Sequence, residues 1–373
     1  MTATMGPTET EQGHHGLSGL RFEIDVSDRR SRRRKAVRRG LLAMLVLVVV
    51  TAVGATIAAF AVQSRLDDQL DRVDDVFTGL DDRPDRAPGA AGRALNVLVM
   101  GTDRRSDLPT TGTDAGAAEW IPGAQRTDTI MVLHIDADRQ GASLISIPRD
   151  TWLYVPGHGM DKVNAAFSLA GPSLAVETIE RMTGLRIDHL AVVDWAGLES
   201  ITDRLGGVTL TVPRTVEDPA NNVVWTAGRQ TLTGAQALLY VRQRYGLPNG
   251  DLDRVRRQQA FLLALMRSAL RALGSHSPFR VYDLLDAVTS NVSVDSGWSV
   301  GEMRGLLLEL RDLAPADLGL ITTPVSGFGY EGEQSVAYLD WAANSELWNA
   351  VYRDDVAQWR SDHPTSTRVG PPT

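Results

Sequence analysis

The chain has 373 residues, of which 43% are hydrophobic and 23% are charged, and it contains no cysteine. This apolar content excludes a fully disordered protein, and the lack of cysteine excludes disulfide frameworks, thiol nucleophiles and cysteine-bearing metal sites. The formal net charge is −8; residues 1–40 carry nine basic and five acidic side chains, a balance of +4, so residues 41–373 carry −12. An acidic body excludes broad nucleic-acid binding, which needs a wide positive surface.

An uncharged segment of 22 residues, residues 41–62, follows the basic tail 1–40. A helix of that length spans about 33 Å, enough for a hydrocarbon layer of about 30 Å. Basic residues precede it and aspartates follow it, so the positive-inside rule predicts a cytoplasmic tail and an extracytoplasmic remainder. A cleaved signal peptide and an Arg-rich nucleic-acid or nuclear-targeting patch are the alternatives. The segment is longer than the roughly 7–15 residues of a signal peptide, and the Arg run adjoins it, so we predict an uncleaved transmembrane helix.

Residues 63–93 are predicted to be a stalk and linker. Apolar residues recur there at heptad spacing over only two heptads, at Leu66, Leu70, Val73, Phe77 and Leu80. Such a helix could pair with a second copy, giving a homo-oligomer, or dock on the domain that follows. Residues 94–360 are predicted to form that one domain, and residues 361–373 a disordered tail.

The domain mixes strand and helix patterns, which predicts an α/β fold, an α-β-α sandwich with a central mixed sheet. The predicted strands are Leu95–Met100, Thr129–Ile135, Ala142–Ile147, Leu190–Val193, Val208–Val212, Leu318–Thr322 and Gln334–Tyr338. The predicted helices are Asp161–Leu169, Ser173–Met182, Trp195–Leu205, Thr233–Tyr240, Asp253–Leu273, Val281–Thr289, Val300–Leu313 and Ala342–Gln358. Thr233 and Gln236 have capping-box spacing.

Polar residues flank the first three of these strands. Asp103 follows the first strand, Asp128 opens the second, and Arg149 follows the third. A hairpin-sized turn makes the second and third strands antiparallel, and an antiparallel first strand would bring all three side chains to one edge. Carboxylates with phosphate oxygens are ligands that suit Mg²⁺. The alternative is that these residues only terminate strands, as turn-forming residues do.

Five arginines lie within 16 residues of this otherwise acidic domain, at positions 242, 244, 254, 256 and 257. Arg242 and Arg244 share a face if that stretch is extended, and with Asp253 as an N-cap Arg254, Arg257 and Gln258 share the start of a helix. Guanidinium groups beside a helix amino terminus favour phosphate, although a solvated face of Arg–Asp pairs is the alternative.

Apolar residues follow on the same helix, at Phe261, Leu262 and Leu265. A cationic start and an apolar continuation fit a phosphate that carries a long hydrocarbon tail. Ordinary core packing is the alternative. The seven histidines are scattered, and His134, within a predicted strand, is expected to be a packed or edge residue.

These blocks together resemble the LytR-CpsA-Psr family of envelope phosphotransferases. The resemblance runs from about residue 95 to residue 273, with a weaker tail to residue 340. It rests on these segments: 96–103, Arg126-Thr-Asp128-Thr129, Ser146-Ile-Pro-Arg149-Asp150, Asp161-Lys162-Val-Asn164, Gly206-Gly207-Val208, 232–238 and 242–259.

The resemblance implies an extracytoplasmic domain that binds a polyprenyl-pyrophosphate-linked glycopolymer, such as an arabinogalactan or a teichoic acid, and transfers it with Mg²⁺ (or Mn²⁺) to peptidoglycan. Asp103 and Asp128 match the metal-binding acids of the family. These two acids and Arg149 are expected to be the catalytic residues. The matching pyrophosphate ligands are Arg149, Lys162, Asn164, Arg242, Arg244, Arg254, Arg257 and Gln258. Asp253 departs from the family, in which many members have glycine there. A polyprenyl-pyrophosphate hydrolase and a non-catalytic membrane-anchored regulator remain open as alternative functions.

Overall fold

The computed structural model describes residues 60–104, 125–243, 251–314 and 316–364, with residues 44, 47–51, 56, 57, 111, 246 and 247. The side chains of residues 103, 104, 125, 126, 251, 252 and 255 lie outside this description, as does most of the predicted anchor 41–62. Within the described part of the chain, no helix is both long and apolar enough to span a bilayer. Contacts divide the chain into residues 1–60 and residues 61–373, and the fold below is that of the second unit.

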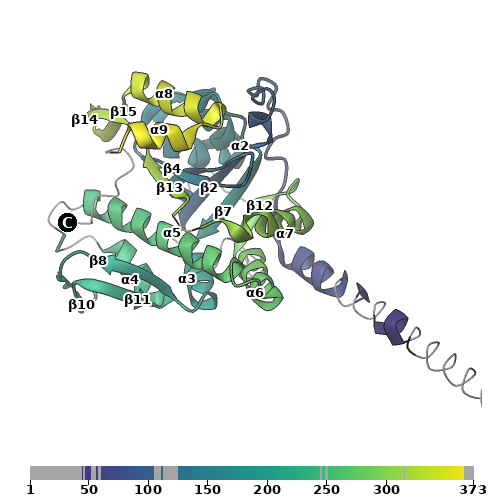
Figure 1. Cartoon of the computed structure of the whole chain (residues 1–373). Coiled ribbons are helices and arrows are strands. Elements are labelled where there is room, and N and C mark those ends of the chain that lie inside the picture. The colour runs from purple at the N-terminus through teal and green to yellow at the C-terminus, as the bar shows by residue number, and fades with distance from the viewer. Residues whose placement is uncertain are drawn as a thin grey trace, which may run out of the picture. The chain divides into compact units, whose positions relative to one another are not determined.

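A seven-stranded mixed sheet forms the centre of this unit (Figure 1). Its strands, in spatial order, are β1 (Asp71–Val73), β12 (Val292–Asp295), β7 (His189–Asp194), β2 (Leu95–Arg104), β3 (Gln125–Ile135), β4 (Ala142–Ile147) and β13 (Leu318–Thr322). Strand β3 is antiparallel to both β2 and β4, while β7 runs parallel to β2 and β13 parallel to β4. The α/β class, the mixed sheet and the antiparallel centre are therefore confirmed.

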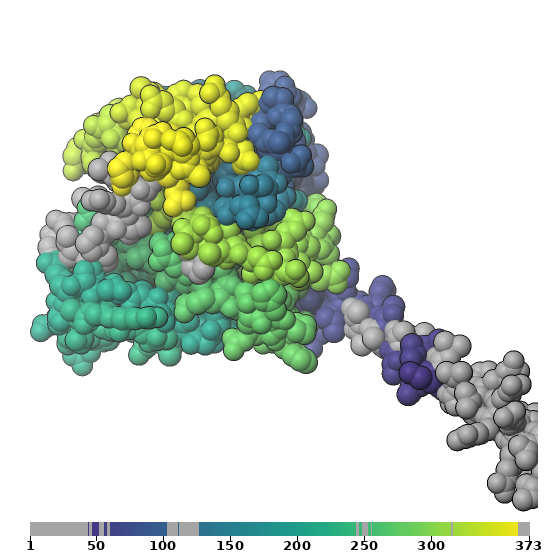
Figure 2. Space-filling model, in the orientation of Figure 1, coloured from purple at the N-terminus to yellow at the C-terminus, as the bar shows by residue number. Residues whose placement is uncertain are grey.

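Helices cover both faces of the sheet because side chains alternate along its strands. Leu98, Met100 and Val132 pack toward α2 (Val163–Thr183), α8 (Trp341–Tyr352) and α9 (Val356–Asp362). Val99, Met131 and Leu144 pack toward α5 (Asp251–Leu273) on the opposite face. Figure 2 shows α8 and α9, in yellow, on one side of the molecule and the green and teal segments on the other.

The remaining long helices include α5, which covers the second face of the sheet. These helices are α3 (Trp195–Arg204), α4 (Gly234–Arg242), α5 (Asp251–Leu273), α6 (Pro278–Thr289) and α7 (Val300–Glu309).

Four two-stranded sheets lie outside the central sheet in the described part of the chain. They pair β8 (Val208–Val212) with β11 (Gly228–Leu232), β9 (Val216–Asp218) with β10 (Val223–Trp225), β5 (Trp152–Val155) with β6 (Gly159–Lys162), and β14 (Val325–Glu331) with β15 (Gln334–Leu339). The predicted capping box of α4 is present, since Thr233 accepts from the Gln236 amide and Gln236 accepts from the Thr233 amide.

The predicted stalk is part of the folded unit. Its helix ends at residue 69 and the chain continues as β1, which pairs with β12. Leu66 and Leu70 are 2% and 6% exposed, so these two heptad side chains are buried against this chain's own core and do not form an open pairing seam. The docking alternative therefore describes these residues, and a continuous stalk helix was the wrong prediction.

One break between predicted helices is confirmed, and one predicted helix is wrong. The helices expected at 161–169 and 173–182 are the two halves of α2, which are separated by non-helical backbone at Ala170 and Gly171 just before Pro172. The helix expected at 342–358 is two helices, because Asp354 has a φ of +60° that no helix continues.

Candidate functional site

Asp128 occupies a bulge in the central hairpin. Gly101 of β2 faces Thr129 of β3, but the next residue of β2, Thr102, faces Thr127, so Asp128 is the extra residue on β3. A bulge of this kind bends the strand and changes the direction of the extra side chain. The bulge therefore points the Asp128 side chain in a direction that the regular alternation of side chains along a strand would not give it.

Arg149 joins Asp128 to a second acid. Its Nη1 lies 2.5 Å from Asp128 Oδ1, and its Nε lies 3.5 Å from Asp150 Oδ2. Lys162 Nζ lies 3.0 Å from the other oxygen of Asp150, and the Asn164 amide donates to the Arg149 carbonyl at 3.2 Å. The structure thus brings Arg149 and Asp128 together, as the strand order predicts. Lys162, which only the family resemblance implies, joins the same network through Asp150, and the chemical roles of all three remain predictions.

A tight turn after β4 sets the position of Arg149. The Pro148 carbonyl accepts from the Thr151 amide at 3.0 Å and from the Thr151 hydroxyl at 2.6 Å. The Thr151 carbonyl in turn accepts from the Val163 amide at 2.8 Å, which ties the turn to the start of α2. Arg149 and Asp150 therefore leave the sheet edge together, and each remains partly exposed.

The donors beside Asp128 suit a hard cation. Among the described residues, only Arg149 hydrogen-bonds the Asp128 carboxylate, at Oδ1, so Oδ2 accepts nothing. The Thr102 and Thr127 hydroxyls that flank the bulge are buried and have no hydrogen-bond partner among those residues. A carboxylate oxygen with no hydrogen-bond partner among the described residues is a ligand type that Mg²⁺ takes. Asp103 is paired in register with Arg126, but its side chain lies outside the described part of the structure.

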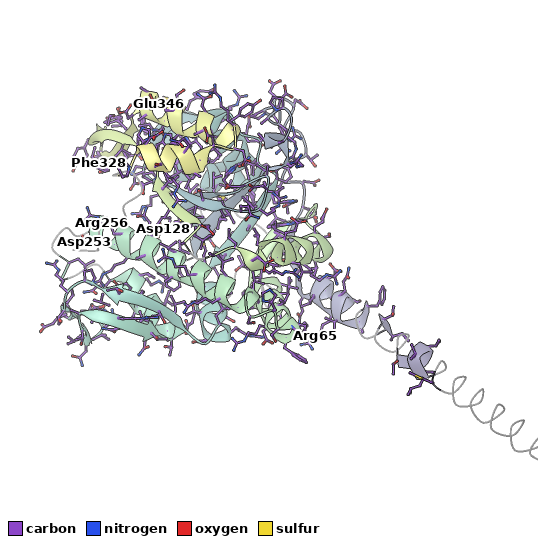
Figure 3. All side chains as sticks on the ribbon, in the orientation of Figure 1. Arg65, Asp128, Asp253, Arg256, Phe328 and Glu346 are labelled. Atoms are coloured by element: carbon purple, nitrogen blue, oxygen red, sulfur yellow. The ribbon has the colours of Figure 1, made fainter. Side chains whose placement is uncertain are left out.

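An apolar cavity of about 160 Å³ opens beside this network, between the sheet and α5. Its walls include Thr129, the residue after Asp128, and the three helix residues predicted to meet a hydrocarbon tail, Phe261, Leu262 and Leu265. Its polar lining includes Thr102, Asp194 and Gln258. Figure 3 shows Asp128 at the sheet and Asp253 and Arg256 at the amino-terminal end of α5.

The predicted arginine cluster divides into different environments. Arg242 ends α4, so the expectation of an extended stretch there is wrong, and its guanidinium lies 5.2 Å from the ring centre of Trp195, a cavity residue. Arg254 is only 6% exposed on α5. Arg244 lies outside the described residues. Helix α5 begins at residue 251, so Asp253 lies within its first turn and is not the predicted N-cap. The Asp253 side chain is fully buried.

Arg257 faces the interior between α4 and α5. It is 2% exposed, its Nη1 donates to Gln243 Oε1 at 2.5 Å, and its guanidinium stacks 4.2 Å from the Tyr240 ring centre. Burial lowers the pKa of Arg257 from its usual value, and the nearby Tyr240 and Asp253 partly oppose that shift. This geometry favours a packing role for Arg257 over contact with a ligand.

Sequence reasoning missed two residues of the site. Asp194 ends β7 and caps α3, accepting from the Gly197 amide at 2.7 Å, and it lines the cavity together with Trp195. An acid at a strand end was visible in the sequence, but only the parallel pairing of β7 with β2 shows that it reaches the edge at which β2 ends.

Comparisons with known proteins agree with this architecture. A sequence model of the LytR-CpsA-Psr family matches residues 56–351. The chain is 36% identical over 325 residues to the probable cell wall biosynthesis protein LcpB of Corynebacterium glutamicum, covering 86% of this chain and 74% of that protein. It is 31% identical to the polyisoprenyl-teichoic acid–peptidoglycan teichoic acid transferase TagU of Enterococcus faecalis, over 58% of this chain and 66% of that one.

Solved structures support the fold. A LytR-Csp2A-Psr enzyme from Actinomyces oris superposes with a TM-score of 0.58 at 22% identity, over 76% of this chain and 96% of that one. The family match covers well over half of the chain, and the two relatives are named for cell wall biosynthesis and for teichoic acid transfer. The chain is therefore a member of the LytR-CpsA-Psr family.

Proposed function

We propose that this protein is a membrane-anchored phosphotransferase that moves a glycopolymer from a polyprenyl-pyrophosphate carrier to a hydroxyl of peptidoglycan. One observation carries the proposal: an apolar cavity opens beside a network of Asp128, Arg149 and Lys162. A ligand that combines a pyrophosphate with a hydrocarbon chain matches both parts of such a site. The teichoic acid transferase named among the relatives supports the same reaction class.

In the proposed reaction the acceptor hydroxyl oxygen attacks the phosphorus next to the glycan. The bond from that phosphorus to the bridging oxygen breaks, and the lipid phosphate leaves with the electron pair. In this proposal Arg149 holds the pyrophosphate, and the bridge that its guanidinium makes between two carboxylates supports an anion-binding role. One of the two acids, Asp103 or Asp128, accepts the hydroxyl proton, and fixed positive groups stabilise the charge that develops.

Asp128, with Asp103, would hold the Mg²⁺ that the family resemblance implies. A divalent cation there would neutralise charge on the phosphate oxygens. We expect Asp128→Asn, which keeps the side-chain shape, to weaken metal and donor binding together. Normal turnover of this variant at limiting Mg²⁺ would contradict the assignment.

The proposed anchor is the apolar segment 41–62, with residues 1–40 in the cytoplasm and the folded unit outside. Protease added to intact spheroplasts should then remove an epitope at residue 373 and spare one at residue 2. The opposite pattern would reverse the proposed topology.

The direct test incubates the full chain in liposomes with a lipid-pyrophosphate glycan and peptidoglycan. Mass spectrometry should find the glycan joined to a muramic sugar through one phosphodiester, together with lipid monophosphate. Glycan phosphate released into solution would instead identify a hydrolase, and unchanged donor would favour a non-catalytic regulator.

A further inference from the structure

A buried histidine lies at the far end of the central strand from Asp128. His134 is fully buried on β3, six positions along the strand from Asp128, which is about 20 Å at roughly 3.3 Å per residue. The proposed transfer reaction does not use it. Its two ring nitrogens have different partners.

The hydrogen bonds of Asn96 assign the His134 tautomer. Asn96 Nδ2 donates to the Arg186 carbonyl at 3.1 Å, so Asn96 Oδ1 is the atom that faces His134 Nδ1, at 2.8 Å. Nδ1 must therefore carry a proton. In the neutral ring the other nitrogen, Nε2, then presents a lone pair away from Asn96.

Two carboxylates face that lone pair. Asp354 Oδ1 lies 3.2 Å from His134 Nε2, and Asp136 Oδ1 lies 3.8 Å from it. All three atoms lie within 4.8 Å of one another. Three acceptors aimed at a common point need a proton or a cation between them.

The backbone around both acids is shaped to hold them there. Asp354 adopts a φ of +60°, which ordinarily favours glycine, and its two oxygens each accept the Ala137 amide at 3.2 Å. A Cβ on Gly141 would lie 2.3 Å from Asp136 Oδ2, so the absence of a side chain at position 141 makes room for that carboxylate. Strain and close approach at one point commonly mark a functional constraint.

We propose that His134, Asp136 and Asp354 bind a structural divalent transition-metal ion, with Zn²⁺ as the best fit. Metal–ligand bonds of about 2.1 Å in a tetrahedron place ligand atoms about 3.4 Å apart, close to the two measured separations. The set of one imidazole and two carboxylates favours Zn²⁺ over Mg²⁺ or Ca²⁺, which prefer oxygen ligands alone. Asn96 supplies the hydrogen bond that orients a metal-bound imidazole.

Partial exposure of the two acids leaves room for a water ligand. Their side chains are 23% and 16% exposed. The ion would join the β3–β4 turn to the loop between α8 and α9, segments that are more than 200 positions apart in the sequence. Its effect would be on stability and not on phosphoryl transfer.

The metal-free alternative is a protonated His134 between the acids. Arg360 and Asp138 are the other charged groups that act on Asp136. Arg360 forms no ion pair with Asp136 within 4.0 Å in the described structure. A divalent ion would balance the two carboxylates on its own.

The test uses the untagged full chain in detergent, stripped with a chelator and then titrated with Zn²⁺. We expect one calorimetrically detected site per chain and a rise of roughly 5 °C or more in the unfolding midpoint at saturating metal. Asp354→Asn should weaken Zn²⁺ binding at least tenfold. Asparagine tolerates the positive φ at this position, so the variant should fold.

Asp138→Asn is the matched control, because Asp138 is an exposed acid of the same turn and lies outside the cluster. It should bind Zn²⁺ with the affinity of the unaltered chain. Mg²⁺ should change the unfolding midpoint of the unaltered chain and of the Asp354→Asn variant by the same amount. Equal Zn²⁺ binding by the Asp354→Asn variant, or no binding by the unaltered chain, would overturn the proposal and leave the protonated histidine network.

Discussion

Arg149 and Arg257 have the same charge in opposite surroundings. The Arg149 side chain is 27% exposed and lies between Asp128 and Asp150, where an incoming phosphate can displace or join a carboxylate. Arg257 is 2% exposed and stacked on Tyr240. A side chain that takes up an anion must be reachable, so the two arginines should respond differently to substitution.

Arg149→Lys should reduce turnover by about 30- to 1000-fold, because lysine keeps the charge but loses the planar fork that grips phosphate, a loss of about 2–4 kcal/mol. Steady-state kinetics measure this effect. Arg256→Lys is the control, since the Arg256 side chain is 39% exposed and its contact with Asp253 is 3.4 Å long. Equal tolerance at both positions would mean that Arg149 does not touch the donor.

Arg257→Ala should lower the free energy of unfolding by about 2–4 kcal/mol, because it removes a buried side chain together with its hydrogen bond to Gln243 and its stacking on the Tyr240 ring. Denaturant unfolding measures this change. KM for the lipid-linked donor should stay within about threefold. A raised KM with unchanged stability would place Arg257 among the pyrophosphate ligands.

Helix α5 carries two kinds of side chain along one element. Its amino-terminal turns carry the arginines, while Phe261, Leu262 and Leu265 line the cavity. Leu262 and Leu263 both pack against Met131 and Leu144, but Leu263 does not line the cavity and also packs against the core cluster that contains Leu270 and Leu284. Filling the cavity should therefore affect ligand binding separately from folding.

Leu262→Trp should raise KM for a long-chain donor by at least tenfold and leave the unfolding midpoint nearly unchanged, because the indole occupies space that is open in the unliganded protein. A short-chain donor analogue should be affected less. Leu263→Trp, one residue along, should instead lower the midpoint through overpacking. An unchanged KM for Leu262→Trp would separate the cavity from the donor site.

Among the strands, the sequence predicted several with a strong apolar pattern and missed others, the three-residue strands among them. Strands β4, β8 and β13 match their predicted limits, because each is a continuous or alternating apolar run between turn residues. Strands β1, β9 and β10 have three residues each, too few to establish a period. The Asp128 bulge and the paired position of Asp194 depend on strand register, which only tertiary pairing sets.

For the whole molecule, the folded unit begins well before residue 94. Leu66, Leu70 and Val76 are buried in the core, and β1 extends the sheet. Arg83 forms an ion pair with the buried Glu180 at 2.7 Å, and Arg86 forms another with Asp188. The predicted linker is thus fixed to the domain at several points.

A fragment that begins at residue 94 should therefore be unstable, while one that begins at residue 61 should unfold cooperatively. Losing three buried aliphatic side chains costs roughly 5–9 kcal/mol, comparable to the whole stability of a domain. Circular dichroism and thermal unfolding compare the two fragments. Equal midpoints would show that residues 61–93 only rest on the surface.

The central claim is the transfer of a glycan phosphate from a lipid carrier to peptidoglycan, and a labelled donor tests it most directly. The donor carries ³²P only in the phosphate next to the glycan, and it is incubated with the reconstituted full chain, Mg²⁺ and peptidoglycan. If the chain catalyses this transfer, the label enters peptidoglycan as a phosphodiester, and one unlabelled lipid monophosphate is released for each label transferred. Label found only in soluble glycan phosphate, or left in the donor, would contradict it.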